Sequence, residues 1–287
     1  MRVLLAWMSL LVLLVPGPAV GAEGPLTRHR SAGGMEYLLA VPEGRGDVPL
    51  MVFLHGCGAD PAAYGLQEFG ERAGFAVLLP LQGGPEGCWD WVGDRRRGAG
   101  QLAEIAAVTA EVEDGHPIDA ARVFAAGHSA GSGMTANLVS AYPEVYAAAG
   151  FVAGCGRWVC SDVTGALAHA EMGARARPVP AYIVWGTADQ TNPYASGRLQ
   201  LLRWLGMNDR ADDGRLDLSV PRLPTGLAWH GPDGSRPAFT VETYRSACAP
   251  VVFASGHGMG HIPDFTWPDV LPAMTAFLLA HPRTPAC

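Results

Sequence analysis

The run GHSAG at positions 127–131 is the part of the sequence whose residue types point most directly to chemistry. It follows the apolar run 122–127 and leads into a stretch of helical character, so its serine is expected on a sharp turn between a strand and a helix. Glycines at both ends of such a turn permit a tight backbone that larger residues would prevent. An ordinary glycine-rich turn remains the alternative, since the chain has 37 glycines. Interpreted as a nucleophile elbow, the run predicts Ser129 as a catalytic nucleophile.

Two residues downstream of Ser129 are candidates for the partners that a serine nucleophile needs. A serine hydroxyl is a weak nucleophile until a base removes its proton. Asp189 follows the apolar run 181–186, and His261 ends the run HGMGH that follows the apolar residues 251–256. The chain order serine, aspartate, histidine is that of the α/β-hydrolase arrangement. It predicts His261 as the base and Asp189 as the acid that orients and stabilises its imidazole.

Both partners have competitors in the sequence. His257 also follows the last apolar run, but His261 lies deeper in a glycine-rich loop that can turn back over the sheet, and we favour it as the base. Asp189 also suits a turn or a helix N-terminus, since an Asn-Pro pair follows closely; we favour the acid role because Ser129 requires one. The other candidate acids follow no clear buried strand directly: Asp162, Asp212, Asp213 and Asp264.

A hydrolase of this kind also needs an oxyanion hole, which is a pair of N–H groups that stabilise negative charge on the substrate oxygen. One amide normally follows the nucleophile and the other lies on a loop after an early strand. The Ala130 amide meets the first requirement. The run HGCG at 55–58 follows the apolar residues 49–54, and its Cys57 amide is the candidate for the second. A plain tight turn is the alternative interpretation of this run.

The elements that would position these residues are short apolar runs bounded by Gly, Pro or Asp. Their unbroken apolarity favours strands of a parallel sheet covered on both faces. The runs begin near residues 49, 74, 122, 147, 181 and 251, and helical stretches begin near residues 100, 130, 196 and 270. The alternation predicts an α/β fold of the α/β-hydrolase type, with a mostly parallel central sheet flanked by helices in a single catalytic domain. Residues 207–237 lack a clear period and are expected to form a loop or small hairpin near the site.

Composition and the N-terminus indicate one exported globular domain. Of the 287 residues, 49% are hydrophobic and 16% are charged, which suits a well-buried core. An apolar stretch over residues 3–15, followed by small residues at 20–22, predicts a cleaved signal peptide at 1–22 and a catalytic domain at 23–287. The stretch is short for a membrane span, which needs roughly 20 residues. We expect a secreted or periplasmic protein with no membrane partner after cleavage, and the net charge of −7 argues against nucleic acid.

The cysteines of an exported chain are expected to form disulfides rather than free thiols. An even count favours three bridges, although six cysteines allow about 15 pairings. No metal or other cofactor is expected, because no C-x-x-C or H-E-x-x-H motif stands near another ligand cluster. Residues 131–136 fit a dinucleotide-binding fingerprint, but the elbow already uses that turn and no acidic residue ends a second strand at the required spacing. The cysteines are Cys57, Cys88, Cys155, Cys160, Cys248 and Cys287.

An ordered series of motifs resembles one esterase family: HGCGAD, CWDW, IDAARVFAAGHSAG, YPEVYAAAGFVAG, GTAD and GMGH. The chain is similar over residues 35–280 to the secreted esterases of the polyhydroxybutyrate depolymerase and feruloyl esterase type. The resemblance implies an α/β-hydrolase fold, triad roles for Ser129, Asp189 and His261, oxyanion amides at Cys57 and Ala130, and a Cys57–Cys88 disulfide. The chain departs from the family pattern where Trp185 precedes GTAD and where IPDF follows His261, at positions expected to line or support the substrate pocket.

The expected activity is that of a secreted serine carboxylic-ester hydrolase. It would act through an acyl-enzyme intermediate on feruloyl or aryl esters or on short hydroxyalkanoate esters. Soluble esters or oligomers are favoured over crystalline polyester, because little chain follows the last predicted helix. Trp89 and Trp91 are candidates to hold a substrate ring or acyl chain, and core packing beside a disulfide is an equal alternative. The alternatives for the whole chain are a peptidase of the same fold and a non-catalytic binding protein, and the sequence predicts no oligomeric state.

Overall fold

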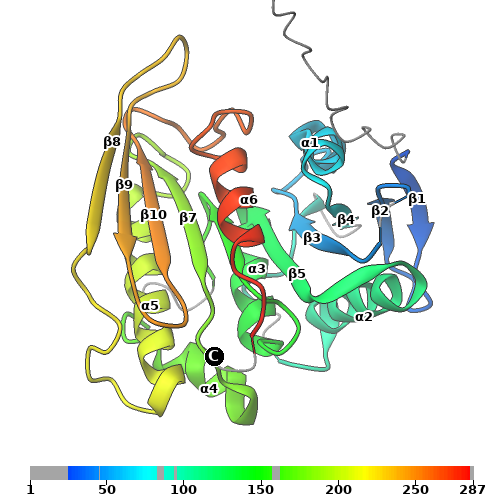
Figure 1. Ribbon diagram of the computed structural model, residues 1–287, viewed down its shortest axis with the longest axis horizontal. Coiled ribbons are helices and arrows are strands. Elements are labelled where there is room, and N and C mark those ends of the chain that lie inside the picture. The colour runs from blue at the N-terminus through cyan, green and yellow to red at the C-terminus, as the bar shows by residue number, and fades with distance from the viewer. Residues whose placement is uncertain (1–24, 45, 83–86, 94–95, 157–161, 285–287) are drawn as a thin grey trace, which may run out of the picture.

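The computed structural model describes residues 25–44, 46–82, 87–93, 96–156 and 162–284 (Figure 1). The predicted signal segment and Cys160 and Cys287 lie outside these residues. No helix in the described ranges combines the length and apolarity that crossing a membrane requires.

One sheet runs through the molecule (Figure 1). In chain order its strands are β1 (Thr27–Arg30), β2 (Glu36–Ala40), β3 (Val48–Leu54), β4 (Ala76–Pro80), β5 (Ile118–His128), β6 (Ala149–Val152), β7 (Ala181–Gly186), β8 (Gly226–His230), β9 (Phe239–Tyr244) and β10 (Val251–Gly256). Their spatial order is β1-β2-β4-β3-β5-β6-β7-β10-β9-β8. The central strands from β4 to β10 pair in parallel, and the strands at both edges run antiparallel. The predicted mostly parallel α/β sheet is therefore confirmed.

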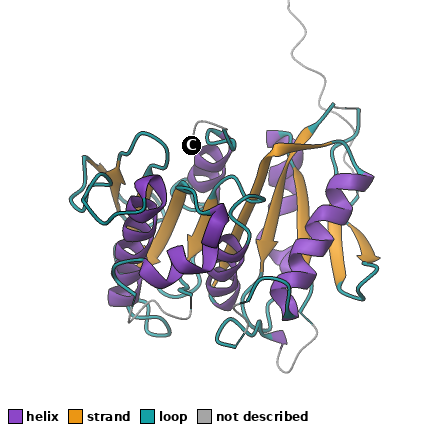
Figure 2. Ribbon diagram, turned by 90° about the horizontal axis from the view of Figure 1, so that it is seen from below, coloured by secondary structure: helices purple, strands orange, loops and turns teal. Residues whose placement is uncertain are grey.

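Helices cover both faces of the sheet (Figure 2). They are α1 (Leu66–Ala73), α2 (Gly100–Gly115), α3 (Ala130–Ala141), α4 (Ala166–Met172), α5 (Tyr194–Asp213) and α6 (Leu271–Leu279), with short 3₁₀ turns η1 (Pro61–Tyr64) and η3 (Gly173–Arg175). Side chains of α2, α3, α4 and α5 join the apolar core on one face, and those of α1 and α6 join the core on the other.

Strand β3 shows why the predicted strands are apolar at every position. Leu50 and Val52 point into the core that contains α2 and α3, whereas Met51 and Phe53 point into the core that contains α1 and α6. None of these four side chains is more than 1% exposed. A strand buried on both faces needs apolar side chains at odd and even positions alike. Because the central strands are parallel, their carboxyl ends and the loops that follow them lie at one edge of the sheet.

The expectation for residues 207–237 is wrong in part. Residues 207–213 are the last two turns of α5, and β8 pairs with β9 at the edge of the sheet. The helical period is hard to see in this part of α5 because some of its buried residues are polar. Asn208 accepts a hydrogen bond from the Val179 amide, and Asp209 accepts hydrogen bonds from the amides of Leu218 and Val220. The segment is thus the end of α5, an irregular stretch and the first strand of the antiparallel β8–β9 pair, so the hairpin alternative holds only at its end.

Candidate active site

Ser129 occupies the turn between β5 and α3 in a strained backbone conformation. Its φ of 54° and ψ of −122° are unusual for a residue with a side chain, and such outliers cluster at functional sites. A Cβ on Gly127 would lie 2.5 Å from the Gly131 backbone, and one on Gly131 would lie 2.0 Å from the Leu54 carbonyl oxygen. Only glycine fits at either position. The GHSAG run therefore has the strand-turn-helix context that a nucleophile elbow requires.

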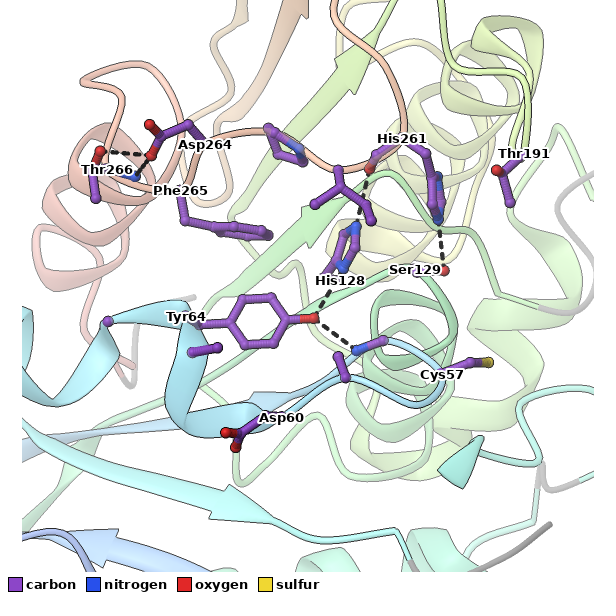
Figure 3. A pocket seen from close by; sticks show the side chains of 16 residues that line it. Cys57, Asp60, Tyr64, His128, Ser129, Thr191, His261, Asp264, Phe265 and Thr266 are labelled. Carbon is purple, nitrogen blue, oxygen red and sulfur yellow. Dashed lines mark hydrogen bonds between the residues drawn. The ribbon is translucent and has the colours of Figure 1, made fainter. Parts of the chain in front are cut away.

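Ser129, His261 and Asp189 form one hydrogen-bonded line, of which Figure 3 shows the serine and the histidine. His261 Nε2 lies 2.9 Å from Ser129 Oγ, and His261 Nδ1 lies 2.8 Å from Asp189 Oδ2. A carboxylate only accepts, so Nδ1 carries the proton and Nε2 of the neutral ring can accept the serine proton. The other oxygen of the buried Asp189 accepts the amides of Thr191 and Asn192, at 2.9 and 2.8 Å. The aspartate is thus both a turn residue and the partner of the histidine.

The competing histidine and acids lie elsewhere. His257 is exposed, hydrogen-bonds the hydroxyl of Thr240, and has its ring centroid 5.1 Å from that of Trp229. Asp189 is the only carboxylate in the described part of the chain that pairs with His261. The rival acids have other partners: Asp162 pairs with Arg203, Asp212 with Ser219, Asp213 with the Arg215 amide, and Asp264 with Thr266.

The loop after β3 is held so that the Cys57 amide has a defined direction. His55 Nε2 accepts the Gln82 amide, so its Nδ1 carries a proton and donates to the Gly56 carbonyl at 2.8 Å. The amide N–H of Cys57 points opposite to that carbonyl, because the peptide between them is planar and trans. In the described structure neither the Cys57 amide nor the Ala130 amide donates to a protein acceptor. Their role as oxyanion donors stays a prediction.

A disulfide joins Cys57 to Cys88 and so ties the loop after β3 to the segment after β4. Cys248 is also disulfide-bonded, and Cys155 is partly buried. Three bridges in total stay a prediction, since Cys160 and Cys287 lie outside the described residues. The described residues hold no cluster of three or more His, Cys, Asp or Glu side chains arranged for a metal ion.

A cleft of about 640 Å³ opens in front of Ser129 and His261 (Figure 3). One wall is formed by residues 56–65 and the other by residues 261–266, and most of the surface is contributed by apolar atoms. The apolar lining includes Ala59, Ala63, Tyr64, Ile262, Pro263 and Phe265. An apolar cleft with a few polar groups at one end is typical of a small-molecule site.

The tryptophans singled out in the sequence pack in the protein instead of lining this cleft. Trp89 is 3% exposed, and its indole N–H donates to the His55 carbonyl at 2.9 Å. Trp91 packs against the core beside Gly133 of α3, and its carbonyl accepts the side-chain amide of Asn137. The packing alternative therefore fits both residues, and the substrate-binding alternative has no support in the described cleft.

Two residues at the site were not predicted from the sequence to be functional. Tyr64 lies on η1 and His128 directly precedes Ser129, and their side chains hydrogen-bond each other at the floor of the cleft (Figure 3). Burial lowers the pKa of His128 to about 4. The ring is therefore neutral at neutral pH. The only signal in the sequence is that His128 occupies the variable position before the serine in the elbow.

The lowered pKa predicts a pH-dependent contribution of His128 to stability. Between about pH 6.5 and pH 4 an unfolded histidine binds a proton that native His128 does not, so this contribution is lost as the pH falls. Glu171 acts in the opposite direction over nearly the same range, because burial raises its pKa to about 7. The effect must therefore be measured as the difference between wild type and His128→Asn.

We expect the stability advantage of wild type over His128→Asn to shrink by about 2 kcal/mol between about pH 7 and about pH 5. Urea unfolding of both proteins at the two pH values measures it, and Glu171 cancels in the comparison. An advantage that stays constant or grows as the pH falls would show that native His128 is not neutral across this range.

The comparisons with known proteins agree with this geometry. The family model described as esterase PHB depolymerase matches residues 35–195, more than half of the chain. Poly(3-hydroxyalkanoate) depolymerase C of Paucimonas lemoignei is 29% identical over 242 residues, which are 81% of this chain and 51% of that protein. Acetylxylan esterase A of Aspergillus awamori is 30% identical over 157 residues, which are 49% of this chain and 52% of that protein. The chain thus spans about half the length of these curated relatives.

A solved structure supports the fold. The acetyl xylan esterase from Aspergillus awamori superimposes with a TM-score of 0.68 at 21% sequence identity, covering 83% of this chain and 94% of that one. At that level of identity the likeness concerns the arrangement of the sheet and helices rather than the reaction.

Proposed function

Because the chain belongs to the esterase PHB depolymerase family, we propose that it is a serine hydrolase of carboxylic esters with Ser129 as nucleophile, His261 as base and Asp189 as acid. One observation carries the proposal: the hydrogen-bonded line of these three residues ends on a strained serine at the floor of an open apolar cleft. Nucleophile, base and orienting carboxylate within hydrogen-bond reach are the signature of covalent catalysis by serine.

The geometry supports a reaction in two stages. His261 Nε2 takes the proton of Ser129 Oγ as the oxygen attacks the ester carbonyl carbon, and the Asp189 carboxylate stabilises the resulting imidazolium. The amides of Cys57 and Ala130 donate to the oxyanion that forms. His261 then gives its proton to the departing alcohol and leaves an acyl group on Ser129. In the second stage water attacks the acyl-enzyme while His261 takes its proton. His261 then returns the proton to Ser129 Oγ as the carboxylic acid leaves.

The cleft favours uncharged acyl or alcohol groups. The side chains of Tyr64, Ile262 and Phe265 give it an apolar surface, and the exposed carboxylates of Asp60 and Asp264 lie among its lining residues. These carboxylates repel a negatively charged substrate group. Feruloyl or aryl esters and short hydroxyalkanoate esters fit this surface. The names of the relatives, a poly(3-hydroxyalkanoate) depolymerase and a feruloyl esterase, point to the same two classes, and the acetylxylan esterases add acetyl esters of xylan as a third.

Export from the cytoplasm is part of the proposal. It rests on the signal segment predicted over residues 1–22 and on the disulfide between Cys57 and Cys88, since disulfides persist in oxidising compartments. An exported esterase would act on esters outside the cell or in the periplasm.

A panel of substrates tests the proposal and separates it from its alternatives. We expect the protein to hydrolyse p-nitrophenyl acetate and butyrate, and at least one of methyl ferulate, hydroxybutyrate oligomers and acetylated xylo-oligosaccharides. Cleavage of a peptide anilide without cleavage of any ester would support the peptidase alternative. A folded protein that hydrolyses nothing in the panel would support the binding protein.

A further inference from the structure

The side chains of Tyr64 and His128 connect the loop after β3 to the loop after β10 through three hydrogen bonds (Figure 3). The Gly56 amide donates to Tyr64 Oη at 3.0 Å. Tyr64 Oη lies 3.0 Å from His128 Nδ1, and His128 Nε2 lies 3.0 Å from the carbonyl oxygen of His261. The chain of contacts therefore begins beside Cys57 and ends on the backbone of the proposed base.

Only one placement of protons satisfies all three bonds when the ring is neutral. A carbonyl oxygen accepts but never donates, so His128 Nε2 carries the proton and Nδ1 is the acceptor. The Tyr64 hydroxyl must then donate to Nδ1 while its oxygen accepts the Gly56 amide. The groups that face His128 are the Tyr64 phenol, the His261 ring and the Asp189 carboxylate, and burial keeps the His128 pKa near 4. The arrangement therefore persists across neutral pH.

The connection is buried and closely packed. Tyr64 is 8% exposed and His128 is 5% exposed. The Phe265 ring lies edge-on to both, with centroids 4.7 Å from Tyr64 and 5.3 Å from His128. A Cβ on Gly56 would lie 3.0 Å from His128 Nδ1, so the loop after β3 approaches the histidine as closely as glycine allows. The Phe265 ring and the Gly56 backbone thus pack directly against the hydrogen-bonded pair of Tyr64 and His128.

We infer that Tyr64 and His128 are positioning residues that hold the Cys57 amide at a fixed place relative to Ser129 and His261. The inference rests on the proposed function, because it concerns the oxyanion donor and the base of that reaction. His128 is joined covalently to Ser129, hydrogen-bonded to the backbone of His261 and linked through Tyr64 to the residue before Cys57. The three loops that carry the proposed reacting groups thus share one rigid contact.

Such a contact is expected to act on the transition state rather than on substrate binding. An oxyanion donor contributes mainly when charge develops on the substrate oxygen, so its displacement lowers kcat more than it raises KM. A displacement of about 1 Å can cost on the order of 100-fold in rate. A purely structural role would lower stability and leave the kcat of each folded molecule unchanged.

Two substitutions break the connection at different points. Tyr64→Phe keeps the ring but removes the hydroxyl, so the Gly56 amide and His128 Nδ1 both lose their partner. His128→Asn keeps an acceptor near Nδ1 for Tyr64 but no longer reaches the His261 carbonyl. Tyr182→Phe is the matched control, because Tyr182 is also a buried tyrosine and its hydroxyl donates to the Asp269 carbonyl, away from the site.

The experiment measures kcat and KM on p-nitrophenyl butyrate for each variant, well below its melting temperature. Active sites are counted by titration with a fluorophosphonate, and kcat is expressed per active site. We expect kcat to fall by about 10- to 100-fold in Tyr64→Phe and in His128→Asn, with KM within about threefold of wild type and Tyr182→Phe nearly unaffected. If one variant yields no titratable protein, the other decides.

A kcat loss smaller than about tenfold in a titratable variant, a loss confined to KM, or an equal kcat loss in Tyr182→Phe would overturn the inference. The same assay includes wild type and Ser129→Ala, and the concentration of Ser129→Ala is taken from its absorbance because the variant has no nucleophilic serine to titrate. An inactive wild type, or a Ser129→Ala variant with wild-type rates, contradicts the proposed function itself. The failure of one is therefore distinguishable from the failure of the other.

Discussion

Replacement of Ser129 by alanine is expected to lower kcat for ester hydrolysis by about 10⁴- to 10⁶-fold. The substitution removes the hydroxyl that lies 2.9 Å from His261 Nε2 and leaves the line to Asp189 intact. No acyl-enzyme can then form, and the remaining rate comes from water attack aided by the oxyanion amides. The loss is measured as kcat on a p-nitrophenyl ester, with contaminating esterase excluded by a second purification of the variant.

Ser140→Ala is the control for this substitution. Ser140 is a buried serine in α3, the helix that begins directly after Ser129, and its hydroxyl donates to the Ala136 carbonyl one turn earlier. Its replacement removes the same hydroxyl oxygen from a serine that does not line the cleft, so kcat is expected to stay within about threefold of wild type. Comparable rates for Ser129→Ala and Ser140→Ala would refute the assignment of Ser129 as nucleophile.

Substitution of the proposed base is expected to have the second largest effect. His261→Gln should lower kcat by about 10⁴-fold or more, because a glutamine amide cannot take the proton of Ser129 in the attack. The buried Asp189 carboxylate also loses the imidazolium that it stabilises in the transition state. The measurement is kcat at an alkaline pH. There hydroxide can replace the missing base, so the residual rate of the variant is at its highest.

His257→Gln is the matched variant, since both histidines lie in the same loop and compete for the role in the sequence. His257 is exposed and contacts Thr240 and Trp229 rather than Ser129. Its replacement is expected to leave kcat within about threefold of wild type. The reverse result, with His257→Gln inactive and His261→Gln active, would identify His257 as the base.

The central sheet could be predicted from the sequence because its strands are buried on both faces. Runs such as residues 49–54 and 181–186 are apolar at every position, and this pattern persists whatever the neighbouring strands are. The edge strands lack it. Every residue of β1 is exposed, and all but the first residue of β8 are exposed, so only hydrogen bonds to β2 and β9 make them strands. Such pairing depends on the fold and leaves little trace in the local sequence.

Much of the candidate site follows from chain order, and the rest does not. Ser129, Asp189 and His261 each follow a recognisable strand, so the order of motifs was enough to select them and the structure brings them together. Tyr64 and His128 are 64 residues apart, and no spacing or composition links a tyrosine in a 3₁₀ turn to a histidine in the elbow. Their hydrogen bond is a product of tertiary packing.

The resemblance to the polyhydroxybutyrate depolymerase and feruloyl esterase type was confirmed by the family match over residues 35–195. It also supplied the Cys57–Cys88 disulfide, since six cysteines alone leave the pairing open. The cleft between residues 56–65 and 261–266 could not be anticipated, because its shape depends on how two loops distant in sequence face each other.

A pre-steady-state experiment tests the central claim, that Ser129 forms an acyl-enzyme, most directly. Enzyme mixed with excess p-nitrophenyl butyrate is followed for the release of nitrophenol, then quenched in acid and digested for mass spectrometry. The account predicts a burst of about one nitrophenol per active site and a butyryl group on the peptide that contains Ser129. Acyl transfer to a different residue, or steady hydrolysis with neither burst nor adduct when acylation is made faster than deacylation, would contradict it.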